Sequence, residues 1–409
     1  MKRTILTMML SLPLIITSCN EDDGISSASN ERKDIVLSRT EQQMTDKNVT
    51  FAFSFFSKMN ELETEKPNWM VSPLSASIAL SMTANGTEGN SRNQIQEVLG
   101  FEDFQMEEVN AYNNRLADEL MSLDNTTKFN LANSVWLHHE FNVYDSFIET
   151  NEEMYDAQVT SLDLTTPLAL EAINNWSAEQ TNNLIPEILD ELPANLRFCF
   201  LNSLYFKGIW KERFKESATT DEIFTCADGK KSRVKMMKQK EVFLYCSNET
   251  FMLTKFPFGN EAFSMTVLLP NEGHTLEESL REFTAEYWTE SMKMKGEELD
   301  VQFPRFELKY EVDLIDVMKG LGITEIFDEE NADFSKMTPN NVFVNLFKQA
   351  AYIKADEEGA EAAATTIVGG MDSDSVFKTI DFHMNRPFAF LIEEESTGVI
   401  LFMGKIEEL

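Results

Sequence analysis

The sequence predicts a single large domain of the α+β class that follows a short N-terminal tail. The chain has 409 residues, of which 43% are hydrophobic, and this is ample for one large core. Helix-like segments with 3.6-residue periodicity and strand-like segments with alternating side chains both occur along it. With 11 prolines and 16 glycines, the chain contains no long linker and no repeat of fixed period.

The first 18 residues have the form of a secretory signal rather than of folded structure. Two basic residues precede the apolar run ILTMMLSLPLII. The next residues, ITSC, resemble a bacterial lipobox, which would make Cys19 the lipid-modified first residue; an ordinary signal peptide is the alternative. Residues 19–45 are then expected to form a lipidated, polar tether. The resemblance implies a lipid anchor in the bacterial cell envelope, at the outer membrane, on its periplasmic or its outer side.

The formal net charge of -34 argues against a nucleic-acid partner, because nucleic acid requires a basic surface. A solvated acidic surface explains this charge, and steering of a basic partner is the alternative. Cys199, Cys226 and Cys246 form neither a CxxC pair nor a metal-binding pattern. Their odd number argues against a disulfide framework, so we expect small buried hydrophobic side chains.

The first half of the domain is expected to begin with a helix, because apolar residues repeat at helical spacing in residues 49–59. In residues 68–100, a short strand ends at Ser72 and a second helix follows, which two glycine pairs interrupt. Residues 129–164 predict a strand, a helix and a strand. Residues 171–189 predict an amphipathic helix followed by a turn.

The second half of the domain contains more strand-like sequence. Residues 198–214 alternate as a strand, and residues 251–272 predict two strands around a Gly-Asn turn. A strand, a helix and a loop are expected in residues 301–338, and further strand-like text fills residues 341–355. Residues 387–406 predict a closing hairpin of buried strands.

Between these strands lies the segment DEEGAEAAATT, residues 356–366. Its Ala and Glu residues favour a helix, but the β-branched residues that follow them are poor helix formers. Written as a strand, one face carries only small side chains, and the other face is more polar. Such a segment is small enough to enter a narrow slot between strands, so we expect a chain that can exist in two states. The first face consists of Ala360, Ala362, Ala364 and Thr366.

The text EEGAEAAATT closely resembles the proximal hinge of the serpin family, EEGTEAAAAT. NSLYFKGIWKERF is similar to the family's NAIYFKGKWKKPF, and further similar motifs extend over residues 50–409. The resemblance implies a serpin-like single domain, residues 46–409, with a large central mixed β-sheet and additional smaller sheets. It also implies about eight to nine helices and an exposed reactive-centre loop.

The resemblance further implies a monomeric suicide inhibitor that forms a covalent complex with a serine or cysteine protease. The protease would cut one bond in the reactive region, and the hinge would insert into the central sheet. A non-inhibitory binding or chaperone-like protein of the same fold is the main alternative, and an unrelated surface lipoprotein is the second. The reactive region consists of Met371, Asp372, Ser373 and Asp374. The hinge consists of Glu357, Glu358, Gly359, Ala360, Glu361, Ala362, Ala363, Ala364, Thr365 and Thr366.

Five further positions match the family's shutter and breach, the regions where the sheet opens. Ser72, Ser75 and Asn202 fall in the shutter and Trp210 falls at the breach, while Gln349 stands where the family usually has histidine. Ser72 is alternatively a helix cap with proline behind it, and Trp210 is alternatively ordinary core. Since glutamine does not become cationic near neutral pH, we expect shutter opening without a histidine-type pH step.

No catalytic motif such as GxSxG, HExxH or a P-loop occurs, so we expect no enzyme activity and no cofactor. His138, His139 and Glu140 form the one metal-like cluster. Neighbouring residues on a strand point to opposite faces, which argues against a shared metal ion.

Overall fold

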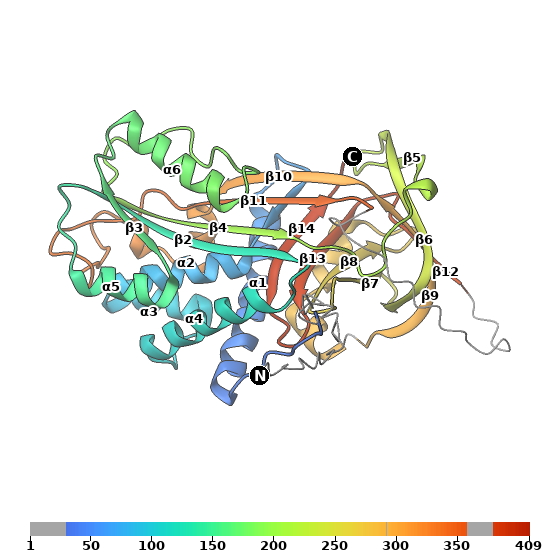
Figure 1. The fold of residues 1–409 in the computed structure, drawn as a ribbon, viewed down its shortest axis with the longest axis horizontal. Coiled ribbons are helices and arrows are strands. Elements are labelled where there is room, and N and C mark those ends of the chain that lie inside the picture. The colour runs from blue at the N-terminus through green and yellow to red at the C-terminus, as the bar shows by residue number, and fades with distance from the viewer. Residues whose placement is uncertain (1–29, 292, 358–378) are drawn as a thin grey trace, which may run out of the picture.

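The computed structural model describes residues 30–291, 293–357 and 379–409 (Figure 1). Within these residues the chain forms α-helices and three short helical turns, η1 (Glu216–Ala218), η2 (Tyr287–Ser291) and η3 (Glu325–Phe327). The α-helices are α1 (Arg39–Leu62), α2 (Pro73–Gly86), α3 (Gly89–Leu99), α4 (Met106–Ser122), α5 (Asp145–Tyr155), α6 (Pro167–Gln180), α7 (Leu276–Glu282) and α8 (Ile315–Leu321).

The largest sheet of the described chain has nine strands in the order β1-β14-β13-β8-β7-β6-β9-β12, with β5 paired to β6. It is mixed, because β12 runs parallel to β9 while the other pairs are antiparallel. Its strands are β1 (Trp69–Val71), β5 (Thr220–Thr225), β6 (Lys231–Ser247), β7 (Phe251–Phe258), β8 (Phe263–Pro270), β9 (Lys295–Pro304), β12 (Ile380–His383), β13 (Phe388–Glu394) and β14 (Ile400–Ile406).

The remaining described strands form two smaller sheets. One has the order β3-β2-β4, and the other is the pair β10-β11. Figure 1 shows β10, β11, β4 and β2 lying side by side, with α2 against them. A small apolar core joins α6 to β4 and β11, whereas the main core lies on the opposite face of β4. These strands are β2 (Lys128–His138), β3 (Gln158–Leu162), β4 (Phe198–Lys207), β10 (Phe306–Asp313) and β11 (Lys348–Ala355).

The predicted fold class is confirmed: the described chain combines helices with a large mixed sheet and two smaller sheets. The expected strand, helix and strand of residues 129–164 form, and so does the closing hairpin. The helix and turn expected in residues 171–189 form: α6 ends at Gln180, and Asn182 and Asn183 adopt positive φ in the turn that follows. The glycine pairs interrupt the helical region as expected, since α2 ends at Gly86 and a separate helix, α3, begins at Gly89.

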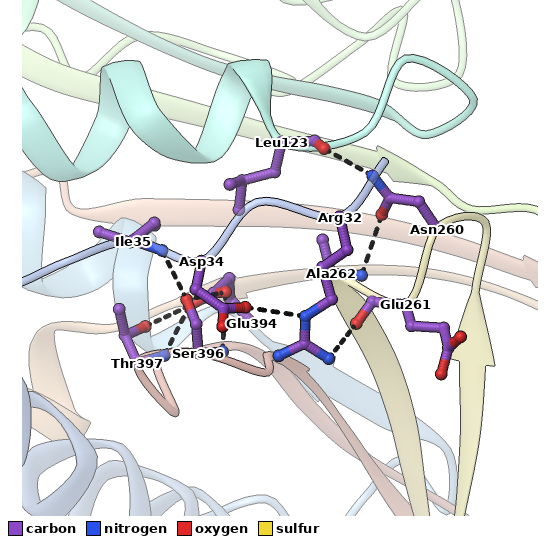
Figure 2. Close-up of polar contacts among 10 residues, drawn as sticks. All are labelled: Arg32, Asp34, Ile35, Leu123, Asn260, Glu261, Ala262, Glu394, Ser396 and Thr397. Atoms are coloured by element: carbon purple, nitrogen blue, oxygen red, sulfur yellow. Dashed lines mark hydrogen bonds and ion pairs between the residues drawn. The ribbon is translucent and has the colours of Figure 1, made fainter. Parts of the chain in front are cut away.

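The N-terminal strap, residues 30–37, packs against the domain (Figure 2). The Ile35 amide donates to Ser396 Oγ at 2.9 Å, and Arg32 Nη1 donates to the Glu261 carbonyl at 3.0 Å. A capping box of Ser38 and Glu41 then starts α1. The prediction of a tether through residue 45 therefore differs from the structure, in which the tail is already packed at Ile35 and helical from residue 39.

In the part of the chain that the structure describes, no helix combines the length and apolar character needed to cross a membrane. Cys199 and Cys226 are buried, Cys246 is half-buried, and all three thiols are free. Burial raises the pKa of the Cys199 thiol to about 12, so this side chain behaves as a small apolar group.

Candidate functional site

Strands β4 and β11 are neighbours, but no backbone ladder joins them although both are described in full. Each is hydrogen-bonded on its other side, β4 to β2 and β11 to β10. A cavity of about 300 Å³ lies between their C-terminal halves, lined by Tyr205 and Trp210 on one side and Tyr352 on the other. Two strand edges therefore face each other across a slot, which is an arrangement that a further strand could complete.

The two edges run in the same direction. Near the start of β11, Gln349 is linked through α2 to Asn202 in the middle of β4. Beyond the ends of both strands, Trp210 Nε1 donates to the Asp356 carbonyl at 2.8 Å. A segment that left β11 and folded back into the slot would run antiparallel to both edges, so it could pair with each of them.

A buried chain of hydrogen bonds crosses between β11 and β4 at the end of the slot where β11 begins. The Ser72 amide donates to Gln349 Oε1 at 2.8 Å, and Gln349 Nε2 donates to the Ser72 carbonyl at 2.9 Å. Ser72 Oγ accepts from the Ser75 amide at 3.1 Å, and Ser75 Oγ donates to Asn202 Oδ1. All four predicted shutter residues are buried and lie together. Ser72 is also the N-cap of α2, as the alternative interpretation predicted.

The same chain of bonds continues through residues that the sequence did not single out. Asn202 Nδ2 donates to Asn133 Oδ1 at 2.6 Å, and Asn133 Nδ2 donates to the Tyr155 carbonyl at 2.7 Å. The network therefore ties β11, α2, β4, β2 and α5 together beneath the sheet. Because its members are buried, separating β4 from β11 would require these bonds to rearrange.

Trp210 lies at the other end of the slot, just beyond the last residues of β4 and β11. Its ring stacks on Phe258, with the centroids 4.6 Å apart and the planes 15° apart, and it also packs against Phe214 and Phe303. The indole N–H bonds the backbone where β11 ends. Trp210 is therefore packed in the core and also joins the ends of β4 and β11.

Glu357 is the one predicted hinge residue within the described chain, and its side chain is 7% exposed. Arg305 holds it with two hydrogen bonds of 2.6 Å, and Thr219 Oγ1 donates a third. Burial alone would raise the pKa of Glu357, but these bonds outweigh it and hold the pKa below its ordinary value. The base of the predicted loop is thus fixed to the strands around it.

The other predicted functional residues lie outside the described residues. These are Cys19, the hinge positions from Glu358 to Thr366 and the reactive region of Met371, Asp372, Ser373 and Asp374. Sequence reasoning also missed Arg305 and Thr219, which lie 52 and 138 positions before Glu357. No local pattern in the sequence indicates either partner.

His138 and His139 lie together, so the expectation that they point to opposite faces of a strand is wrong. Strand β2 ends at His138, and the two rings meet with centroids 4.7 Å apart. They lie near Asp163 as a group of possible ligands. However, His138 Nδ1 accepts a hydrogen bond from the Leu164 amide at 3.2 Å, so this nitrogen already has a partner.

Comparison with known proteins gives the same architecture. The family model described as serpin (serine protease inhibitor) matches residues 46–409. The leukocyte elastase inhibitor of Xenopus laevis is 30% identical over 370 residues, which cover 87% of this chain and 96% of the relative. The solved structure of tengpin, a thermophilic serpin in its native state, has a TM-score of 0.81 at 25% identity, covering 92% and 96% of the two chains. Human thyroxine-binding globulin in complex with its ligand also has a TM-score of 0.81 at 25% identity, covering 90% and 99%.

Proposed function

The chain belongs to the serpin family, and we propose that it inhibits a serine or cysteine protease as a suicide substrate. One observation carries the proposal most directly. The parallel edges of β4 and β11 face each other without a ladder, and the chain that leaves β11 carries the small side chains of the hinge. That chain would enter the slot in the antiparallel direction and complete a continuous sheet.

The proposed reaction begins when the protease attacks a bond between Met371 and Asp374. Its serine or cysteine forms an ester or thioester with the upstream part of the loop, and the downstream amine leaves. The freed hinge then inserts between β4 and β11. About a dozen new backbone bonds, at roughly 1 kcal/mol net each, would supply on the order of 10 kcal/mol. This energy displaces the attached protease and distorts its oxyanion hole, so water does not release the enzyme.

The hinge sequence favours rapid insertion. Alanine loses no rotamer freedom on burial, and its methyl group needs little space in the slot. A long charged side chain on the inward face of the hinge would slow insertion, and the protease would then complete hydrolysis. Thyroxine-binding globulin has the same fold and binds a small ligand, so a binding role is the second candidate.

The decisive experiment incubates the purified chain with proteases that prefer Met, Asp or Ser before the cut. We expect an SDS-stable complex with at least one serine or cysteine protease. Ala360→Arg should convert the inhibitor into a substrate, because position 360 lies on the small-residue face of the hinge. Glu361→Arg, on the opposite face, is the matched control and should retain the complex. Clean cleavage by every protease of the panel would favour the binding role.

We also propose that Cys19 carries a lipid that anchors the chain in the bacterial envelope. The lipobox-like ITSC text supports this proposal. Expression in a bacterial host with a radiolabelled fatty acid should label the chain, and Cys19→Ala should remove the label. A labelled Cys19→Ala chain would contradict the lipid assignment.

A further inference from the structure

Three side chains with metal-binding atoms converge on the outer face of β9 and β12. Asp300, Asp381 and His383 place one ligand atom each within 4.8 Å of one another. They share a face, because the intervening Val301 and Phe382 are buried in the core. We propose that these three residues form a binding site for a divalent transition-metal ion of the Zn²⁺ class.

The first support is an imidazole nitrogen that lacks a partner. His383 Nε2 is buried and forms no hydrogen bond among the described residues. It lies 3.7 Å from Asp300 Oδ2, which is too long for a good hydrogen bond. For two ligands on one tetrahedral metal ion, with bonds of about 2.1 Å, the expected separation is about 3.4 Å. The separation of His383 Nε2 and Asp300 Oδ2 is therefore close to that of two ligands on one ion, and the Asp381 carboxylate would move toward them on binding.

The second support is a facing pair of carboxylates. Asp381 is the direct register partner of Asp300 across the β12–β9 pairing. Like charges that face each other across strands destabilise a sheet. Within the described chain, no lysine or arginine forms an ion pair with either of them. Lys240 is the register partner of Asp300 on the other side, but its Nζ pairs with Glu298 at 3.0 Å. A bound cation would offset the repulsion between these two carboxylates.

The ligand set indicates the class of ion. One imidazole and two carboxylates suit Zn²⁺ and related first-row ions, whereas Ca²⁺ and Mg²⁺ prefer oxygen ligands alone. Three protein ligands leave a coordination position for water. The strongly acidic chain also raises the local concentration of cations.

Such an ion would join an edge strand to the body of the sheet. Strand β12 has four residues and pairs only with β9 among the described strands. The ion would therefore fix residues 380–383 to β9. We expect metal binding to raise the melting temperature and to slow amide exchange in residues 380–383.

The test uses the purified full chain after treatment with EDTA and dialysis. Zn²⁺ is titrated by calorimetry, and Co²⁺ is added as a spectroscopic probe. We expect saturable binding that weakens at least about tenfold in His383→Ala and in Asp381→Asn. His139→Ala, in the second histidine cluster, is the matched control and should bind at this site as the parent does. The exposed position of Asp381 leaves the fold of that variant unaffected, which melting without metal would verify.

Amide exchange locates the site independently of affinity. Zn²⁺ should protect residues 380–383 in the parent chain and in His139→Ala, but not in His383→Ala. Absence of saturable binding would overturn the proposal. So would binding that survives in His383→Ala and Asp381→Asn but is lost in His139→Ala.

Discussion

At the scale of single residues, Glu357 joins the end of β11 to its surroundings. Its nearly buried carboxylate receives two bonds from Arg305 and one from Thr219, while the backbone of the preceding residue accepts a bond from Trp210. These contacts fix the base of the hinge while the edges of β4 and β11 remain unpaired. The hydrogen bonds of Glu357 with Arg305 and Thr219 therefore set the point from which an inserting segment would start.

We predict that Glu357→Gln destabilises the native chain by about 1–3 kcal/mol, because it weakens charge-assisted bonds to Arg305. The destabilisation should be close to about 1 kcal/mol, since the Arg305 side chain is 37% exposed and solvent screens its charge. Urea unfolding measures the difference. Glu216→Gln is the control, because Glu216 acts on Arg305 through its charge alone. Equal losses of unfolding free energy in the two variants would contradict a stabilising role for the Glu357–Arg305 bonds.

The same carboxylate predicts a dependence on pH. Its pKa in the folded chain lies below the ordinary value of 4.5, so the unfolded chain binds the proton more readily. The stabilisation by Glu357 is therefore fully present above about pH 4.5 to 5 and is lost as the pH falls through the folded pKa. Melting temperatures of the parent and Glu357→Gln, measured from pH 3 to 7, should converge in acid. A constant difference over this range would rule out the titration of Glu357 as the cause.

In the shutter, Gln349 both donates to and accepts from the backbone of Ser72. We predict that the rate of loop insertion shows no imidazole-like step between pH 5 and 8. Gln349→His should introduce one, because a protonated imidazole cannot accept the Ser72 amide bond. Tryptophan fluorescence after rapid mixing with protease measures the rate. A tenfold change in the parent chain with an imidazole-like midpoint would refute the prediction.

At the scale of elements, the packing of the N-terminal strap against the domain was not predicted from the sequence. The polar composition of residues 30–37 predicted a tether, yet Ile35 is 6% exposed and packs in the main core. The strap contacts the turns after β7 and after β13, which are remote in the sequence (Figure 2). The start of α1 was detectable, because Ser38 and Glu41 have capping-box spacing. The docking was not, since Ile35, Val36 and Leu37 form an apolar run that is too short to give a periodic signal.

We predict that Ile35→Ala lowers the free energy of unfolding by about 2 kcal/mol or more, because it leaves a cavity at a buried site. Val36→Ala is the matched control, since Val36 is 78% exposed and its truncation should cost less than about 0.5 kcal/mol. Chemical denaturation of both variants gives the comparison. If Ile35→Ala were as stable as Val36→Ala, the strap would not contribute to the folded core.

At the scale of the whole molecule, the sequence predicted the class of fold and most strands of the second half. Apolar, strand-like runs bounded by turn residues identified β7, β8, β13 and β14. Strands β8, β13 and β14 are buried along their whole length, so they appear in the sequence as nearly continuous apolar runs. The separation of β4 from β11 was not predictable, since pairing between distant segments leaves no local pattern. Resemblance identified the shutter residues, but the partners of Glu357 and Asn202 became apparent only from the packing of the strands.

The central claim is that the native chain is not in its most stable form, because the slot between β4 and β11 lacks its strand. The most direct test is the melting temperature before and after a non-target protease cuts between Met371 and Asp374. Completion of the sheet should raise it by at least about 10 °C, since insertion supplies on the order of 10 kcal/mol. Cleaved Ala360→Arg should show a much smaller rise. An unchanged melting temperature in the cleaved parent chain would contradict the account.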